Sequence, residues 1–364
     1  MMNVRVRYFS YLRAVACVAI VILHTFYCAI RLFSPQGNAE LMSLMVRNCM
    51  LWAVPVFVMV TGALLLNPDK RVTTGKIFHG YIRRALCALI VFTFVFALFD
   101  FLVDRHAGGP GAFLIFWLQA LLLNRSWLHM WYLYMLIGIC LMLPLFRLVT
   151  RSRDDRILRY TILILAVFQS VIPTVNFFLS DSSVGFYIMV NTVYPLYLFL
   201  GYAIHTGKIR VTVPAAFLMT VCGAAVILLS TVAGLKNGWD GFSQIAGNYA
   251  SVPVVVASCG IFSLFHAGEP GGKAEPVRAA GSGEASGSGR TSAFQCFLMA
   301  LDRCSFGIYL VHVLVIYTIY RVFLFQPYAH AALPALLLVA VISFAASFAL
   351  SALLRHIPGF RKFL

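Results

Sequence analysis

The stretch Tyr11-Leu-Arg13-Ala-Val-Ala-Cys-Val-Ala-Ile-Val-Ile-Leu-His24-Thr-Phe26 decides the fold, because it is apolar enough to enter a bilayer. Eleven positions at about 100° each return Arg13 and His24 to within about 20° of one helix face, and they climb about 16 Å. This spacing predicts Arg13 near one membrane surface and His24 near mid-membrane. Ionisable side chains aligned at such depth are typical of functional sites. The alternative is that Arg13 only snorkels to lipid phosphates and His24 only hydrogen-bonds a neighbouring helix.

The chain as a whole is also strongly apolar. Its 364 residues are 61% hydrophobic and 11% charged, with a mean hydropathy of +0.89. This exceeds what a soluble domain holds in its core. The nine cysteines stand singly, with no Cys-x-x-Cys pair and no histidine cluster at zinc spacing, so we expect no metal. The sequence therefore predicts an all-α polytopic membrane protein.

Apolar runs of spanning length occur ten times and predict a bundle of about ten transmembrane helices. They cover residues 10–32, 48–66, 85–103, 130–149, 160–179, 186–205, 213–235, 252–266, 305–325 and 331–354. The apolar run 112–123 is too short to span, so we expect it at the membrane interface.

The basic residues set the predicted orientation. The net charge is +16, and with the N-terminus inside, 22 of the 28 Lys and Arg residues fall on the cytoplasmic side. So strong a bias is typical of the positive-inside rule, and it explains the charge better than a nucleic-acid partner does. Both termini are then predicted to be cytoplasmic. Residues 267–292, rich in Gly, Ser, Ala and Glu, are predicted to form a flexible cytoplasmic loop within a single membrane-embedded domain, 1–364.

Five sequence elements together resemble one family, the integral membrane acyltransferase-3 family, and within it most closely the WecH-like O-acetyltransferases of surface polysaccharides. The resemblance covers nearly the whole chain. Its elements are Arg13 and His24 with ten residues between them; Val54-Pro55-Val-Phe57-Val-Met-Val-Thr61-Gly62; Arg83-Arg84; His129-Met-Trp131-Tyr132-Leu-Tyr134; and Ser305-Phe306-Gly307-Ile-Tyr309-Leu-Val-His312.

Two positions depart from the family pattern. The family usually has an acidic residue a few positions before the Arg of the first helix, where this chain has Ser10. Its basic pair before the third helix is often Arg-x-x-Arg, whereas here Tyr81 stands three positions before Arg84. The departures concern the cytoplasmic side of the expected site.

The resemblance implies an enzyme of the bacterial cytoplasmic (inner) membrane. Such an enzyme transfers an acyl group, commonly acetyl, from cytosolic acyl-CoA to a hydroxyl of an extracytoplasmic or lipid-linked glycan. Acetyl-CoA is then the expected co-substrate, and the bilayer and a glycan are the other partners. A neutral His24 suits this in two ways, which the sequence leaves open: it takes the hydroxyl proton as a general base, or it attacks the thioester and carries the acyl group.

The donor side of the expected site is basic. Arg13, Lys76, Arg83 and Arg84 suit the phosphates of CoA, although juxtamembrane Arg residues also serve only as topology anchors. Three residues of the ninth span share a helix face that either lines the acyl-CoA path or only hydrogen-bonds neighbouring helices. These are Ser305, Tyr309 and His312.

The acceptor side is expected at the outer end of the fourth span. His129, Trp131 and Tyr132 suit a sugar, although an aromatic belt at the interface has the same composition. Asp100 and Asp104, at the outer end of the third span, are expected to be solvated.

A function of another class, a secondary transporter or polysaccharide exporter, also fits ten helices. Ion-coupled transporters carry acidic residues at mid-membrane and show paired broken helices in two halves. No predicted span of this chain has an Asp or Glu near its centre. The sequence therefore favours group transfer over ion coupling.

Overall fold

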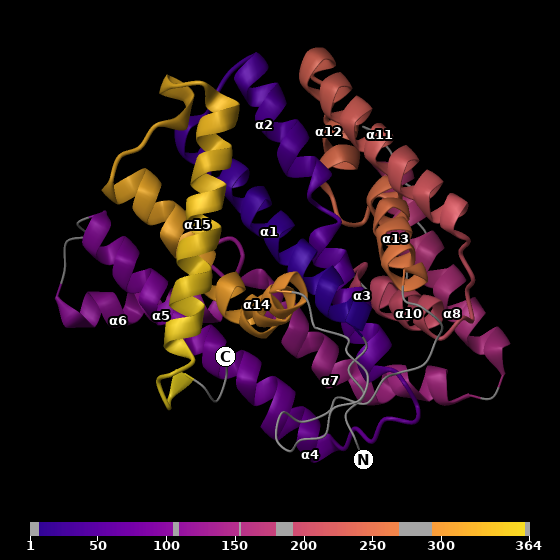
Figure 1. Cartoon of the computed structure of the whole chain (residues 1–364). Helices are drawn as coiled ribbons and strands as arrows, with labels where there is room; N and C mark the ends of the chain where they lie inside the picture. The colour runs from indigo at the N-terminus through magenta and orange to yellow at the C-terminus, as the bar shows by residue number, and fades with distance from the viewer. Residues whose placement is uncertain (1–6, 105–108, 153, 180–191, 269–292, 361–364) are drawn as a thin grey trace. The chain divides into compact units, whose positions relative to one another are not determined.

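The fold was described from a computed structural model, which covers residues 7–104, 109–152, 154–179, 192–268 and 293–360 (Figure 1). In these ranges the chain forms helices and no β-strand. The helices are α1 (Arg7–Phe33), α2 (Asn38–Cys49), α3 (Ala53–Leu65), α4 (Thr74–Lys76), α5 (Arg83–Val103), α6 (Pro110–Leu122), α7 (Trp131–Arg151), α8 (Asp155–Ala166), α9 (Ile172–Asn176), α10 (Tyr194–His205), α11 (Val213–Asn237), α12 (Asp240–Gly247), α13 (Val252–Ala267), α14 (Ala293–Tyr317) and α15 (Ala332–Leu354).

Nine helical segments within the described ranges are long and apolar enough to cross a membrane, and a multi-pass membrane protein is therefore confirmed. The tenth predicted span, 186–205, lies partly outside the described residues, and its described end is α10. The predicted loop 267–292 lies outside them from residue 269 onward.

Helix boundaries differ most from prediction where polar residues enter a span. The predicted span 48–66 is preceded by α2, and a turn at residues 50–52 separates α2 from α3. No continuous apolar run predicts α2, because this helix carries Glu40, Arg47 and Asn48. Short π-helical segments, at Ile77–Ile82, Val167–Val171 and Thr318–Val322, adjoin α5, α9 and the end of α14.

The described part of the chain divides into two compact units. The first unit comprises the described residues of Met1–Ile20, Asn48–Ala63 and Ala166–Ser305. The second comprises those of Val21–Arg47, Leu64–Leu165 and Phe306–Leu364. Both α1 and α14 contribute residues to each unit.

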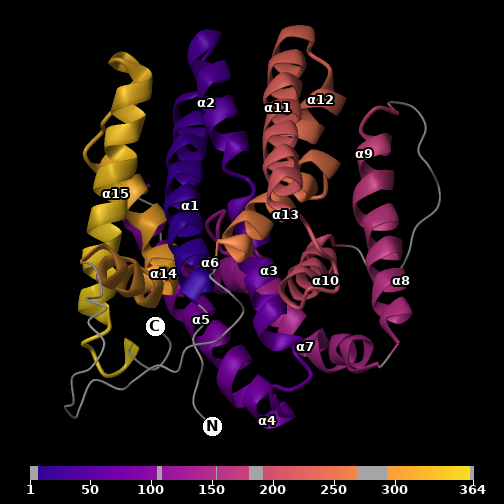
Figure 2. The same ribbon diagram turned by 45° about the vertical axis from the view of Figure 1, so that its right-hand side comes forward.

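Close helix contacts hold the first unit together. Helices α11 and α13 run side by side (Figures 1 and 2). A Cβ added at Gly223 of α11 would lie 2.7 Å from the Pro253 carbonyl oxygen, and one at Gly260 of α13 would lie 2.7 Å from the Ala216 carbonyl oxygen. Only glycine permits this approach, which is the usual device for packing helices where the solvent is as apolar as the side chains.

The second unit is built on an apolar core. Its buried residues come from the second half of α1, from α5, from the start of α7, from the second half of α14 and from α15. Phe26, Phe92, Phe96, Leu133 and Val313 are among them. Helix α6 packs on α5 through the Phe94 and Trp117 rings, whose centroids are 5.6 Å apart.

Candidate active site

Three buried histidines converge in the second unit, and we call them the histidine cluster: His24 of α1, His129 before α7 and His312 of α14. Their side chains are 6%, 1% and 0% exposed. The ring centroids are 4.8 Å apart for His24 and His312, 5.2 Å for His129 and His312, and 6.0 Å for His24 and His129. Imidazoles so deeply buried need specific partners, since unpaired polar groups are costly away from water.

The hydrogen bonds of His312 determine which nitrogens carry protons. Its Nδ1 lies 2.7 Å from the Tyr309 carbonyl oxygen and 3.1 Å from that of Ile308, and only an N–H can bond a carbonyl. In the neutral ring, Nε2 is therefore an acceptor. His24 Nδ1 lies 3.0 Å from this Nε2 and must donate to it. The neutral His24 then keeps Nε2 as its unprotonated, basic nitrogen.

His129 is the least satisfied member of the histidine cluster. Neither of its ring nitrogens makes a hydrogen bond of normal geometry in the described part of the chain, although the Leu310 backbone is close enough to interact with the ring. Burial holds the pKa of His129 well below its usual range, the His312 and His24 rings lower it further, and the Leu310 backbone opposes the shift. An unpaired buried polar group costs about 1 to 3 kcal/mol, and its presence in a native structure calls for an explanation, such as a catalytic role.

Two tyrosines, Tyr309 and Tyr132, pack beside the histidine cluster. The Tyr309 hydroxyl donates to the backbone carbonyl of His129. The Tyr309 ring lies 5.3 Å from the Tyr132 ring, and the Tyr132 ring lies 6.2 Å from that of Trp131. Residues that the sequence assigned to the donor side, Tyr309 and His312, and to the acceptor side, His129 and Tyr132, therefore share one cluster with His24.

Arg13 lies in the first unit, where it forms an ion pair that the sequence did not indicate. Its Nε is 2.7 Å and its Nη2 is 3.1 Å from the two carboxylate oxygens of Asp302 in α14. The Ser10 hydroxyl donates to the same carboxylate at 2.9 Å, and the Ser305 hydroxyl donates to the Asp302 carbonyl at 2.8 Å. We call these four residues the Arg13–Asp302 network.

Asp302 was missed because the predicted ninth span begins at residue 305, whereas α14 begins at Ala293. The acid that the family pattern places before the Arg is absent from α1. In its place, Asp302 supplies a carboxylate to Arg13 from another helix, and Ser10 contacts that carboxylate.

The other predicted donor residues lie in the second unit. Lys76 and Arg83 are exposed, and the Arg84 guanidinium lies over the Phe306 ring, 4.8 Å from its centroid. Burial lowers the pKa of Lys70, and the charges of Lys76 and Arg147 lower it further.

Sequence analysis did not single out Arg147 or Lys70. The Arg147 guanidinium is buried and donates to the backbone carbonyls of Asn67 at 3.0 Å and Lys70 at 2.7 Å. These bonds hold the segment that leads from α3 to α4. The residue was overlooked because its charge had been attributed to topology alone.

Asp100 is paired, and the expectation that it is solvated is wrong. Arg321 Nη1 lies 2.6 Å from one Asp100 oxygen, and the Trp127 indole nitrogen donates to the other at 2.7 Å. Arg321 also pairs with Asp104. The Trp127 ring stacks on Phe96 with centroids 4.3 Å apart, and Phe96 in turn contacts the His129 ring at 5.3 Å. A continuous set of contacts thus joins this ion-pair network to the histidine cluster.

Histidines that lie close together can also bind a metal ion. Among the described residues, no group of three or more His, Cys, Asp or Glu side chains has a geometry that could hold a metal ion. The eight cysteines described are free thiols.

The described residues form a multi-pass membrane protein in which three buried histidine rings lie in contact. Residues 6–356 match the family model described as the acyltransferase domain of acyltransferase family 3, and the chain belongs to this family. It is therefore a membrane acyltransferase. No curated protein and no solved structure gives a significant match to the chain.

Proposed function

We propose that the protein is an acyl-CoA-dependent O-acyltransferase of the bacterial inner membrane. It transfers an acyl group, commonly acetyl, from cytosolic acyl-CoA to a hydroxyl of an extracytoplasmic or lipid-linked glycan, as the WecH-like enzymes that it resembles do. The observation that carries this proposal is the 3.0 Å hydrogen bond between His24 Nδ1 and His312 Nε2. It leaves His24 Nε2 basic, and it provides an acceptor for Nδ1–H when the ring becomes charged.

Either of two routes uses this geometry. In the first, His24 Nε2 takes the proton of the acceptor hydroxyl as its oxygen attacks the thioester carbonyl. The C–S bond breaks, and the CoA thiolate receives the proton. In the second, Nε2 attacks the thioester carbonyl and the C–S bond breaks, which gives an acyl-imidazolium and CoA thiolate. The hydroxyl oxygen then takes the acyl group, His24 returns to its neutral form, and the hydroxyl proton passes to the thiolate. In both, His312 stabilises the charged His24 ring.

The two substrates would be held by different residues. Lys76, Arg83 and Arg84 would bind CoA phosphates, and Arg13 would line the acyl-CoA path, held in place by Asp302. Ser305, Tyr309 and His312 would line the same path as it nears the thioester.

The acceptor would be held by His129, Trp131 and Tyr132. The unpaired nitrogens of His129 offer both a donor and an acceptor to a sugar hydroxyl. The convergence of His129 with His24 supports a hydroxyl acceptor close to the basic nitrogen.

Purified protein supplied with radiolabelled acetyl-CoA tests this function directly. We expect label to leave CoA and appear on a glycan acceptor or on the protein. The double variant Arg83→Gln/Arg84→Gln should weaken acyl-CoA binding by about 1.5 to 3 kcal/mol for each charged hydrogen bond lost. Exposed Arg159→Gln serves as the control. Unchanged acyl-CoA affinity in the double variant would mean that the two arginines only set the membrane topology. A lack of any transfer with a panel of glycan acceptors would reject the proposed function.

A further inference from the structure

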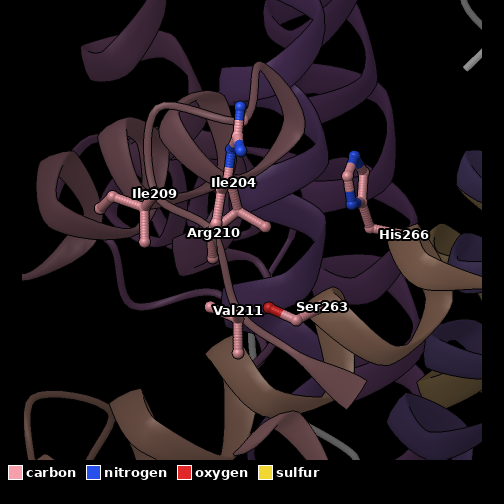
Figure 3. Close-up of a pocket in the computed structure, with 7 residues that line it drawn as sticks. Ile204, Ile209, Arg210, Val211, Ser263 and His266 are labelled. Carbon is pink, nitrogen blue, oxygen red and sulfur yellow. The ribbon is translucent and has the colours of Figure 1, made fainter.

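A small cavity in the first unit lies apart from every residue used in the proposed function. The end of α10, the turn that leads to α11 and the last turn of α13 line it (Figure 3). Gly207, at φ +71°, ends α10 in the left-handed conformation that glycine favours and lets the chain turn there. The cavity volume is about 130 Å³, room for a few water molecules or one group of the size of a phosphate.

Ser263 brings an unsatisfied hydroxyl to this cavity. The residue is 2% exposed, and its Oγ has no hydrogen-bond partner among the described residues. Figure 3 shows the hydroxyl directed toward the segment that carries Val211. Buried hydroxyls are usually paired, so this one is available to hydrogen-bond a group that enters the cavity.

The charges that line the cavity are basic. Arg210 is exposed at its edge, His266 lines it from α13, and none of the seven lining residues is acidic. The His266 ring meets the Tyr8 ring edge-on, with centroids 5.5 Å apart, and the Tyr8 hydroxyl lies 2.7 Å from His205 Nδ1. The His266 imidazole therefore packs against a tyrosine that is itself held by a hydrogen bond. Apolar side chains, among them Ile204 and Ile209, form the rest of the lining.

We propose that this cavity binds the phosphate group of a phospholipid or of a soluble phosphate compound. The Ser263 hydroxyl and the His266 imidazole supply donors. The exposed Arg210 side chain, which Figure 3 shows directed away from the Ser263 hydroxyl, would turn toward a bound phosphate and match two of its oxygens with parallel hydrogen bonds. The apolar lining suits the carbon atoms next to a phosphodiester. The charge pattern predicts this end of α10 and α13 on the cytoplasmic side, where basic pockets between helices bind anionic head groups.

Unfolding temperatures in maltoside detergent, which contains no phosphate, test the proposal on the full chain. The probes are short-chain phosphatidylglycerol, the matching diacylglycerol without phosphate, and inorganic phosphate. We expect phosphatidylglycerol or inorganic phosphate, but not diacylglycerol, to raise the unfolding temperature. A response to the lipid alone identifies a head group, and a response to inorganic phosphate identifies a soluble ligand.

Two variants locate the effect. Arg210→Gln, an exposed change, should weaken the response about tenfold in probe concentration, whereas Arg159→Gln on α8 should leave it unchanged. Ser263→Ala removes an unsatisfied hydroxyl, so without probe it should unfold at the same or a higher temperature, yet respond less to phosphate. Equal loss in Arg210→Gln and Arg159→Gln, or no response of the unaltered protein to either phosphate probe, would overturn the proposal.

Discussion

The histidine cluster and the Arg13–Asp302 network both draw on α1 and α14, yet they differ in how fully their polar groups are satisfied. In the network, the carboxylate of Asp302 accepts three hydrogen bonds, and a positive charge meets a negative one. In the histidine cluster, the hydrogen bonds of His312 allow one arrangement of protons when the rings are neutral, and His24 then retains a basic nitrogen. Neither nitrogen of His129 makes a hydrogen bond of normal geometry. The comparison suggests that the network positions residues and the cluster carries the chemistry.

The largest effect is expected from His24. Loss of a general base costs about 10² to 10⁴ in rate, and loss of a nucleophile costs at least as much, so His24→Ala should abolish measurable acyl transfer. Binding of acyl-CoA should remain. The measurement is transfer from radiolabelled acetyl-CoA, with exposed His79→Gln as the matched control.

His24→Gln separates chemistry from hydrogen bonding, because the amide keeps a donor but takes no proton at neutral pH. If His24→Gln is as inactive as His24→Ala and both remain folded, the cluster carries the chemistry. Restored activity would make His24 a structural residue and would remove the distinction between the two regions.

His312 should have the next largest effect, as a positioning residue for His24. His312→Leu removes the acceptor of the His24 Nδ1–H, and a hydrogen bond to a charged ring is worth about 1.5 to 3 kcal/mol, or roughly 10- to 100-fold in rate. His312→Gln places an amide oxygen near the position of Nε2, so it should recover part of this loss. The loss should appear in kcat rather than in KM.

A purely structural role for His312 predicts a different pattern. Both variants would then lower the unfolding temperature equally, and the activity per folded molecule would stay unchanged. Such a result would leave His24 without the partner that fixes its protons.

How far the sequence predicted these regions depended on whether the interactions are local. The period of the α-helix was enough to place Arg13 and His24 on one face of one helix, and apolar length predicted segments such as α1 and α15. The approach of His129 and His312 to His24 depends on packing between residues far apart in the chain, and no local pattern reports it. Asp302 was missed because a charged residue at the start of a span looks like part of a loop.

Asp302→Asn tests the Arg13–Asp302 network, and its main effect is expected on stability rather than on acyl transfer. It removes the negative charge that pairs with Arg13. Breaking a buried ion pair costs about 3 to 5 kcal/mol, but Arg13 is 25% exposed, so solvent reduces the expected loss to about 1 to 3 kcal/mol. The measurement is the free energy of unfolding in detergent.

In the double variant Arg13→Gln/Asp302→Asn, the loss should be smaller than the sum of the single losses, because the two residues contact each other. Additive losses would show that the pair is not coupled.

Ser10→Ala should have the smallest effect, and it tests whether the Ser10 hydroxyl acts only through Asp302. The variant removes one donor to a carboxylate that keeps two bonds from Arg13, so we expect a loss of about 0.5 to 1.5 kcal/mol in the free energy of unfolding. In the Asp302→Asn background the same change should cost less, because the charge that strengthened the bond is gone. Activity per folded molecule should stay close to that of the unaltered protein. A large loss of transfer in Ser10→Ala with unchanged stability would move the Arg13–Asp302 network from positioning into the chemistry, and the contrast between the two regions would fail.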